Sequence, residues 1–210
     1  MRIRQNERQS LSGSNITKHF RKRGLFAKQP KEGRSFMDYQ KAASYWSEKD
    51  SQAVRLDREA LLAEIEKFII THNTCALATG SGDFVRCTPI EYSYKDGKLW
   101  LLSEGGLKFI ALEGNENVSL AIFDAYTSFS QLGGMQISGT AELVEPWSEE
   151  YMNLLQFKKL STENLKKLPQ TLYLIKITPS QIDFLWSEFK KMGYDSRQHL
   201  SFSNGDTEII

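Results

Sequence analysis

The strongest constraint on the fold comes from a series of short β-type segments between residues 74 and 144. Residues 84–94 and 98–103 are rich in apolar and β-branched side chains, and Lys95-Asp96-Gly97 between them is typical of a tight hairpin turn. Residues 135–144 alternate between apolar and polar side chains, as a strand with one buried face does. Hairpins joined by short links predict an antiparallel sheet rather than a parallel one.

The remaining periodicity predicts a mainly β chain with flanking helices, an α+β protein built on an antiparallel β-barrel. Apolar residues at the helical period predict a helix over residues 58–71, which Asp57 caps and His72-Asn73 ends. We expect about seven strands, which include residues 74–79, 118–123, 171–178 and 181–186 besides those above. Shorter helices are expected after Asp38, from Leu107 to Glu113, from Ser148 to about Leu160, and up to Leu168 before Pro169.

The segment Ser103-Glu104-Gly105-Gly106-Leu107-Lys108 lies between a predicted strand and a predicted helix. Glycine lets backbone amides approach a ligand closely, a helix start carries partial positive charge, and Lys108 adds a full charge. These features predict an anion cradle. The cradle stands between antiparallel strands and not in a βαβ unit, so it does not match a Walker or Rossmann loop. We therefore expect a phosphate-bearing cofactor on a small β-barrel.

The charge of the chain is unevenly distributed. Residues 1–36 hold ten Lys and Arg against two acids, a net of +8, and residues 37–210 hold seventeen against twenty-four, a net of −7. Because residues 1–36 have little apolar periodicity, we expect a basic disordered extension there. Three explanations stay open for it: a nucleic-acid-binding arm, a targeting-like leader, or an upstream extension before a natural start at Met37, which we favour.

The two cysteines, Cys75 and Cys87, fall in apolar strand segments, so we expect buried free thiols. The three histidines are scattered and no Cys/His cluster has the spacing of a metal site, which predicts no bound metal. No apolar run approaches the roughly 20 residues that cross a bilayer, and no secretory signal is visible. We expect no membrane partner and a cytoplasmic location.

Five short segments and one lysine occur in an order and spacing that characterise a protein family. They are Cys75-Ala76-Leu77-Ala78-Thr79, Arg86-Cys87-Thr88-Pro89-Ile90, Leu99-Trp100-Leu101-Leu102-Ser103, Lys108, Asn115-Glu116-Asn117-Val118-Ser119-Leu120 and Ser138-Gly139-Thr140-Ala141-Glu142. In this order and spacing they resemble the FMN-binding split barrel of the pyridoxamine 5'-phosphate oxidase-like family, over roughly residues 57–186. The resemblance implies an antiparallel split β-barrel of the FMN-binding type over residues 57–190. A short helix and linker at 37–56 would precede it, and a polar, weakly structured tail at 191–210 would follow.

The resemblance also implies a homodimer that holds FMN at the subunit interface. Arg86, Ser103 and Lys108 would then hold the cofactor phosphate, since a dianion needs two or more cations and hydrogen-bond donors. The family pattern assigns the ring contacts to the backbone from Arg86 through Cys87, Thr88 and Pro89 to Ile90, the polar edge of the ring to Gln136, and a packing contact to Trp186.

Two departures from the family pattern argue against the synthesis of pyridoxal phosphate. Glu91 stands where the oxidase itself carries a lysine at the end of the second-strand motif. Arg197-Gln198-His199 is similar to its C-terminal Arg-x-His, but Leu200 and Ser201 follow in place of Asp and Arg. A relative of unknown substrate, near the nitroimidazole-reductase-like members, fits the sequence better.

The function that this resemblance implies is a flavin-dependent oxidoreductase, which passes hydride or electrons from a reduced nicotinamide to a small acceptor. The acceptor stays open, and so does deazaflavin in place of FMN, although the compact barrel and single phosphate cradle favour FMN. The alternative is a haem-binding or haem-degrading split barrel with His199 as the iron partner. A third hypothesis is nucleic-acid binding through residues 1–36, but the net charge of −7 elsewhere repels such a ligand, so we expect no nucleic-acid partner.

Overall fold

A computed structural model of the chain describes residues 38–202. The chain divides into two compact units, residues 1–43 and 44–210. Of the first unit only the start of helix α1 (Tyr39–Ser51) is described, where the Asp38 carboxylate accepts a hydrogen bond from the Lys41 N–H at 2.9 Å. This is the predicted cap. The predictions for residues 1–36 and for a start at Met37 lie outside the described residues.

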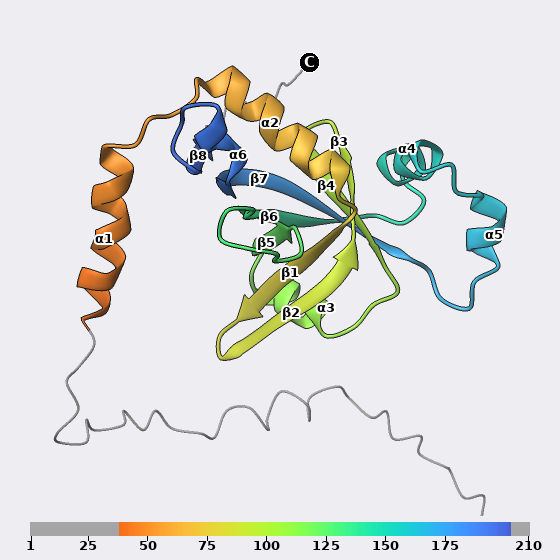
Figure 1. The fold of residues 1–210 in the computed structure, drawn as a ribbon. Coiled ribbons are helices and arrows are strands. Elements are labelled where there is room, and N and C mark those ends of the chain that lie inside the picture. Colours follow the sequence, from red (N-terminus) through yellow and green to blue (C-terminus); the bar gives the residue numbers. More distant parts are fainter. Residues whose placement is uncertain (1–37, 203–210) are drawn as a thin grey trace, which may run out of the picture. The chain divides into compact units, whose positions relative to one another are not determined.

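The second unit is built on one antiparallel sheet that curls into a half-open barrel, which confirms the predicted mainly β split barrel (Figure 1). Its order is β2-β1-β5-β6-β7-β4-β3, and β8 pairs with β7. The strands in the described chain are β1 (Thr74–Ser81), β2 (Phe84–Glu91), β3 (Ser93–Lys95), β4 (Lys98–Ser103), β5 (Asn117–Phe123), β6 (Gly133–Val144), β7 (Tyr173–Trp186) and β8 (Arg197–Ser201).

The two ends of the sheet are drawn toward each other because one stretch of chain changes partner at Tyr92. The sequence predicts a single strand over residues 84–94, but β2 ends at Glu91 and pairs with β1, whereas β3 begins at Ser93 and pairs with β4. Tyr92 is buried between them; its N–H donates to Asn73 O at 2.9 Å and its hydroxyl to Ile69 O at 2.7 Å. Since β2 and β3 stand at opposite ends of the strand order, this switch joins the two ends of the sheet.

The core lies on the inner face of the sheet under helix α2 (Arg58–Thr71), which Figure 1 shows lying across the barrel. Every second residue of β1, β5 and β6 points inward, as Leu77, Leu120 and Ile137 do, each at most 1% exposed. The predicted limits of α2 are confirmed. Ala60 N–H donates to the Asp57 carboxylate at 2.9 Å, and His72 is the C-terminal cap residue.

Strand β7 runs through Pro179, although the sequence predicts a break there. The prediction is wrong because a β-bulge accommodates the proline: the β6–β7 register shifts between Ser138 and Gly139, so that Gly139 pairs with Pro179. A Cβ on Gly139 would lie 2.4 Å from Thr178 O, so only glycine allows this close approach of the two backbones. The single long β7 is the strand to which β6, β4 and β8 all pair.

A second, smaller core holds helices α4 (Glu149–Phe157) and α5 (Thr162–Lys166) beside the barrel. Ser148 caps α4 as predicted, since its hydroxyl accepts from the Tyr151 N–H at 3.3 Å, but α4 ends before the predicted Leu160. Apolar side chains of α4 pack on the outer edge of the barrel, in a cluster of Trp100, Val144, Tyr151, Leu154, Leu155 and Leu174.

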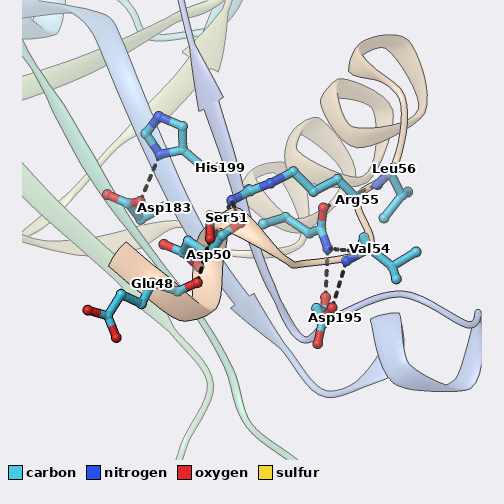
Figure 2. A network of polar contacts seen from close by, with 10 residues as sticks. Glu48, Asp50, Ser51, Val54, Arg55, Leu56, Asp183, Asp195 and His199 are labelled. Carbon is cyan, nitrogen blue, oxygen red and sulfur yellow. Dashed lines mark hydrogen bonds and ion pairs between the residues drawn. The ribbon is translucent and has the colours of Figure 1, made fainter. Parts of the chain in front are cut away.

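The prediction of a weakly structured tail at residues 191–210 is wrong for residues 191–202, and residues 203–210 lie outside the described part of the chain. Helix α6 (Glu188–Lys191) is followed by β8, whose alternation places Gln198 and Leu200 inside, at 0% and 4% exposure. The predicted linker is held by the same segment, because Val54 N–H donates to the Asp195 carboxylate at 2.7 Å and Asp195 N–H donates to Val54 O at 3.0 Å (Figure 2). The polar side chains that suggested a tail form the outer face of an edge strand.

The two cysteines behave differently, which corrects the expectation of two buried thiols. Cys75 is buried, and burial with the nearby Cys87 raises the pKa of its thiol to about 12, whereas Cys87 is exposed on the outer face of β2. Among the described residues, no three His, Cys, Asp or Glu side chains are grouped to hold a metal ion. Within the same residues no helix has the length and apolar character needed to cross a membrane.

Candidate phosphate-binding site

The predicted anion cradle is the turn between β4 and helix α3 (Lys108–Gly114). Gly105 and Gly106 have φ angles of +129° and +103°, a conformation that residues with a Cβ rarely adopt, so the turn requires glycine at both positions. Ser103 ends β4, and its Oγ lies 3.2 Å from both the N and the O of Gly105. Because the turn is tight, the side chains of Ser103 and Lys108 both contact the carbonyl oxygen of Gly105.

Lys108 is a buried cation at the centre of this turn. It is 7% exposed, as is Ser103, and its Nζ donates to Gly105 O. Burial, and after it the positive charge of Arg86, lower the pKa of Lys108 below its usual 10.5. In the part of the chain that the structure describes, no carboxylate pairs with Arg86 or Lys108. Two neighbouring cations without a counter-ion favour an anionic ligand.

Arg86 reaches this region from β2, opposite Thr79 of β1. The next inward pair along the two strands is Leu77 and Thr88. Thr79 is 3% exposed, and the hydroxyls of Thr79 and Thr88 are buried with no hydrogen-bond partner among residues 38–202. Because a buried polar group without a partner is costly, these hydroxyls are suited to a polar ligand.

Helix α3 is anchored on the end of β1, which holds Lys108 near Arg86. Asn115 Nδ2 donates to Gly80 O at 2.8 Å, and a Cβ on Gly114 would lie 2.4 Å from Ser81 Oγ, so helix and strand are in close contact. The helix has only seven residues and Leu107 provides no side-chain cap. The positive field here therefore comes mainly from Arg86 and Lys108, and the start of this short helix adds only a partial charge.

The other predicted flavin contacts divide between β2, which adjoins this cluster, and β6, which does not. Cys87 and Pro89 face outward on β2, and Thr88 and Ile90 are half-buried on the opposite face. Gln136 is exposed on β6, three strands from β2, which corresponds to about 14 Å across the sheet. Of these predicted contacts, the residues of β2 therefore lie beside the cradle, and Gln136 does not.

Trp186 is part of an aromatic cluster on the inner side of β7. Its ring stacks on Phe184 at a centroid distance of 5.6 Å and meets Phe189 edge-on at 5.3 Å. It faces away from Gln136, because its register partner Gly133 is three residues from Gln136 and strand faces alternate. Core packing therefore accounts for this tryptophan within one copy of the chain.

The cluster of Arg86, Ser103 and Lys108 fits a phosphate monoester in charge and in hydrogen bonding. Such a group carries about 1.5 to 2 negative charges and three acceptor oxygens. The two cations match the charge, and the hydroxyls of Ser103, Thr79 and Thr88 supply donors. Sequence reasoning missed Thr79, although the alternation of Cys75, Leu77 and Thr79 already places it on the inner face.

Comparison with known protein families finds a match over residues 61–186, more than half of the chain, to the family described as pyridoxamine 5'-phosphate oxidase. Among solved structures, ChuZ from Campylobacter jejuni is 16% identical, with 72% of this chain and 63% of that chain covered and a TM-score of 0.51. A conserved hypothetical protein from Mycobacterium tuberculosis is 22% identical, with coverages of 72% and 94% and a TM-score of 0.51.

The heme storage protein HutZ from Vibrio cholerae is 19% identical, with 60% of this chain and 90% of that chain covered and a TM-score of 0.48. Comparison with curated protein sequences finds no match. At these identities, the two structures with a TM-score of 0.51 show a shared fold.

Proposed function

The chain belongs to the pyridoxamine 5'-phosphate oxidase family, and from this membership we propose that it is an FMN-dependent oxidoreductase acting on a small acceptor. The observation that carries the proposal is the pair of cations, Arg86 and Lys108, beside buried hydroxyls; within the described part of the chain neither the cations have a paired carboxylate nor the hydroxyls a hydrogen-bond partner. Bound there, the flavin would supply the redox chemistry, and the protein would hold the phosphate and exclude water. A reduced nicotinamide is the proposed electron donor.

We further propose that the active form is a homodimer with the flavin between two copies. In one copy Gln136 is in register with Ala121, Ala76 and Pro89 on the outer face of the sheet, whereas Arg86 pairs with the inward Thr79, so in the proposed dimer it is the second copy that brings its Gln136 to the flavin. The outer face of the sheet also exposes large apolar side chains, with Val85 at 78% and Phe123 at 61%. Covering them with a second copy would remove apolar surface from water.

The proposal is tested by adding FMN or riboflavin to the flavin-free full chain and following fluorescence quenching, together with the mass in solution by light scattering. We expect FMN to bind one per chain and more tightly than riboflavin, which lacks the phosphate, and we expect a dimer. Equal affinity for the two flavins would refute the phosphate site. Failure to bind either would refute the cofactor assignment.

Haem binding is the second candidate. It is favoured by the position of His199, which lies on strand β8 and not in a weakly structured tail as the sequence predicts. Its Nδ1 lies 2.9 Å from the Asp183 carboxylate, the type of partner that orients metal-bound histidines. Against it, the other ring nitrogen already contacts Ser201 Oγ at 2.9 Å. Titration of haemin into the wild type and a His199→Ala variant distinguishes the two: a Soret shift lost in the variant would establish haem binding.

A further inference from the structure

The segment between helix α5 and strand β7 lies against the turn that forms the anion cradle. Tyr173, the first residue of β7, pairs with Ser103, the last residue of β4, so the chain that leads into β7 arrives beside the turn. The ring of Tyr173 also contacts that of Phe109 in α3, at a centroid distance of 5.2 Å. The segment therefore contacts the chain on both sides of the two cradle glycines.

Within this segment Gln170 bonds directly to the backbone of the turn. Its Nε2 donates a hydrogen bond to Glu104 O. The same nitrogen lies 3.2 Å from the position that a Cβ on Gly105 would take, so the amide of Gln170 packs against this glycine as well. A side chain that is 66 residues away in the sequence thus contacts the middle of the cradle.

The hydrogen bond from Gln170 determines how the peptide between Glu104 and Gly105 is oriented. In a trans peptide the C=O and the N–H point in opposite directions. Because the C=O of Glu104 is held by Gln170, the N–H of Gly105 points the other way and donates to Ser103 Oγ at 3.2 Å. Each end of this peptide therefore has a side-chain partner that fixes its plane.

This orientation decides what the hydroxyl of Ser103 can do. Since its oxygen accepts from the Gly105 N–H, its hydrogen is left for another acceptor. That acceptor is Gly105 O at 3.2 Å, which is longer than the roughly 2.5–3.0 Å of a good O–H···O bond. A phosphate oxygen carries charge and is a stronger acceptor than a carbonyl. The hydroxyl of Ser103 is therefore poised to donate to a phosphate.

The segment that carries Gln170 is itself held in place. Pro169 fixes the backbone φ angle at the residue before it. Tyr151 of α4 is 0% exposed, and its hydroxyl donates to Leu172 O at 2.9 Å. Leu174, two residues further, is part of the second core. This smaller core thus supports Gln170 and, through it, the cradle.

We propose that Gln170 is a positioning residue for the cofactor phosphate, an inference that rests on the proposed function. Gln170 holds the peptide of Glu104 and Gly105, this peptide orients Ser103, and the hydroxyl of Ser103 donates to the phosphate. Gln170 acts through the turn and makes no contact with the flavin. Riboflavin has no phosphate, so its binding does not depend on Gln170.

The test replaces Gln170 by methionine, which keeps the length of the side chain and removes the donor. Gln156→Met is the matched control, since Gln156 is exposed on α4. We expect Gln170→Met to weaken FMN binding about three- to tenfold, the value of one neutral hydrogen bond, and riboflavin binding by less than about twofold. Because Gln170 is exposed, the melting temperature of the flavin-free protein should stay close to that of the wild type. The control should change none of these.

A double variant shows whether Gln170 acts through Ser103. In Ser103→Ala the hydroxyl is already absent, so adding Gln170→Met should weaken FMN binding by less than about a further twofold. Additive losses would overturn the proposal, and so would an unchanged FMN affinity in Gln170→Met or an equal loss of riboflavin binding.

A measurement on the flavin-free full chain separates this proposal from the cofactor assignment. Proton–nitrogen NMR follows the amide of Gly105, which donates to Ser103. Ser103→Ala and Gln170→Met should both shift its resonance and speed its exchange with solvent, whereas Gln156→Met should not. If the wild type binds no FMN, the proposed function fails by itself. An unmoved Gly105 amide in Gln170→Met would show that Gln170 does not orient the turn.

Discussion

Replacing Lys108 by methionine should have opposite effects on FMN binding and on stability. Methionine keeps most of the volume of the side chain and removes its charge. In the flavin-free protein the charged form is disfavoured by burial and by Arg86, as the lowered pKa of Lys108 shows. Removing that charge should therefore raise the melting temperature of the flavin-free protein. The same change removes one of the two cations proposed to hold the phosphate.

The loss of affinity follows from the value of a hydrogen bond to a charged group, about 1.5–3 kcal/mol. Since about 1.4 kcal/mol is a factor of ten in affinity, FMN binding by Lys108→Met should weaken ten- to hundredfold. Arg86→Ala should give a loss of the same order. Because both groups share one anion, the double variant should deviate from the sum of the single losses.

The assay is a fluorescence titration of each variant with FMN and with riboflavin, alongside thermal melting without flavin. Lys190→Met serves as the matched control, since Lys190 is exposed on α6. Riboflavin should bind the wild type and all variants within about twofold, a difference of only about 0.4 kcal/mol. An unchanged FMN affinity in Lys108→Met and Arg86→Ala, with folding intact, would refute the phosphate site. A parallel loss of riboflavin binding would show that the substitutions disturb the whole pocket.

Three further outcomes are expected. Burial and Arg86 lower the pKa of Lys108, so FMN affinity should fall as the pH rises through that lowered value, below 10.5, in a titration where riboflavin stays constant. Over the same window the flavin-free wild type should gain stability in denaturant melts, because the unfolded chain still binds the proton that the fold has released. Gly106→Ala, at a φ of +103°, should cost about 1–3 kcal/mol in the same melts and weaken FMN binding. Gly139→Ala should lower the melting temperature more than Gly82→Ala, because a Cβ at Gly139 meets Thr178 O at 2.4 Å, whereas at Gly82 nothing lies within 4 Å and the cost is only that of a φ of +58°.

Local patterns in the sequence were sufficient for elements with strong signals in neighbouring residues. The limits of α2 followed from an N-terminal Asp57 and a 3.6-residue period, and the hairpin turn followed from Lys95-Asp96-Gly97. Such signals depend only on neighbours in the chain. Residues 197–201 were missed because an edge strand with one polar face and five residues is too short to differ from a loop by its composition.

The candidate site was predicted only in part, because local signals reveal residues that are neighbours in the chain and not those that meet through folding. Ser103, Gly105, Gly106 and Lys108 lie within one turn, so their spacing alone indicated an anion cradle. The partnerless hydroxyls of Thr79 and Thr88, and the nearness of Arg86 to Lys108, depend on pairing between strands. The same holds for the chain of Asp183, His199 and Ser201, which two strands assemble.

Alternation, capping and glycine, which are visible in the sequence, were enough to predict most of the strands and helices and the short turn that can approach an anion. The tertiary structure alone decided where Tyr92 moves the chain from one sheet partner to another, and which inward side chains then remain without a hydrogen-bond partner. The burial of a side chain and the charges around it are set only when segments that are distant in the sequence come together in the fold. The pKa of Lys108 and the environment of His199 are therefore properties of the assembled barrel.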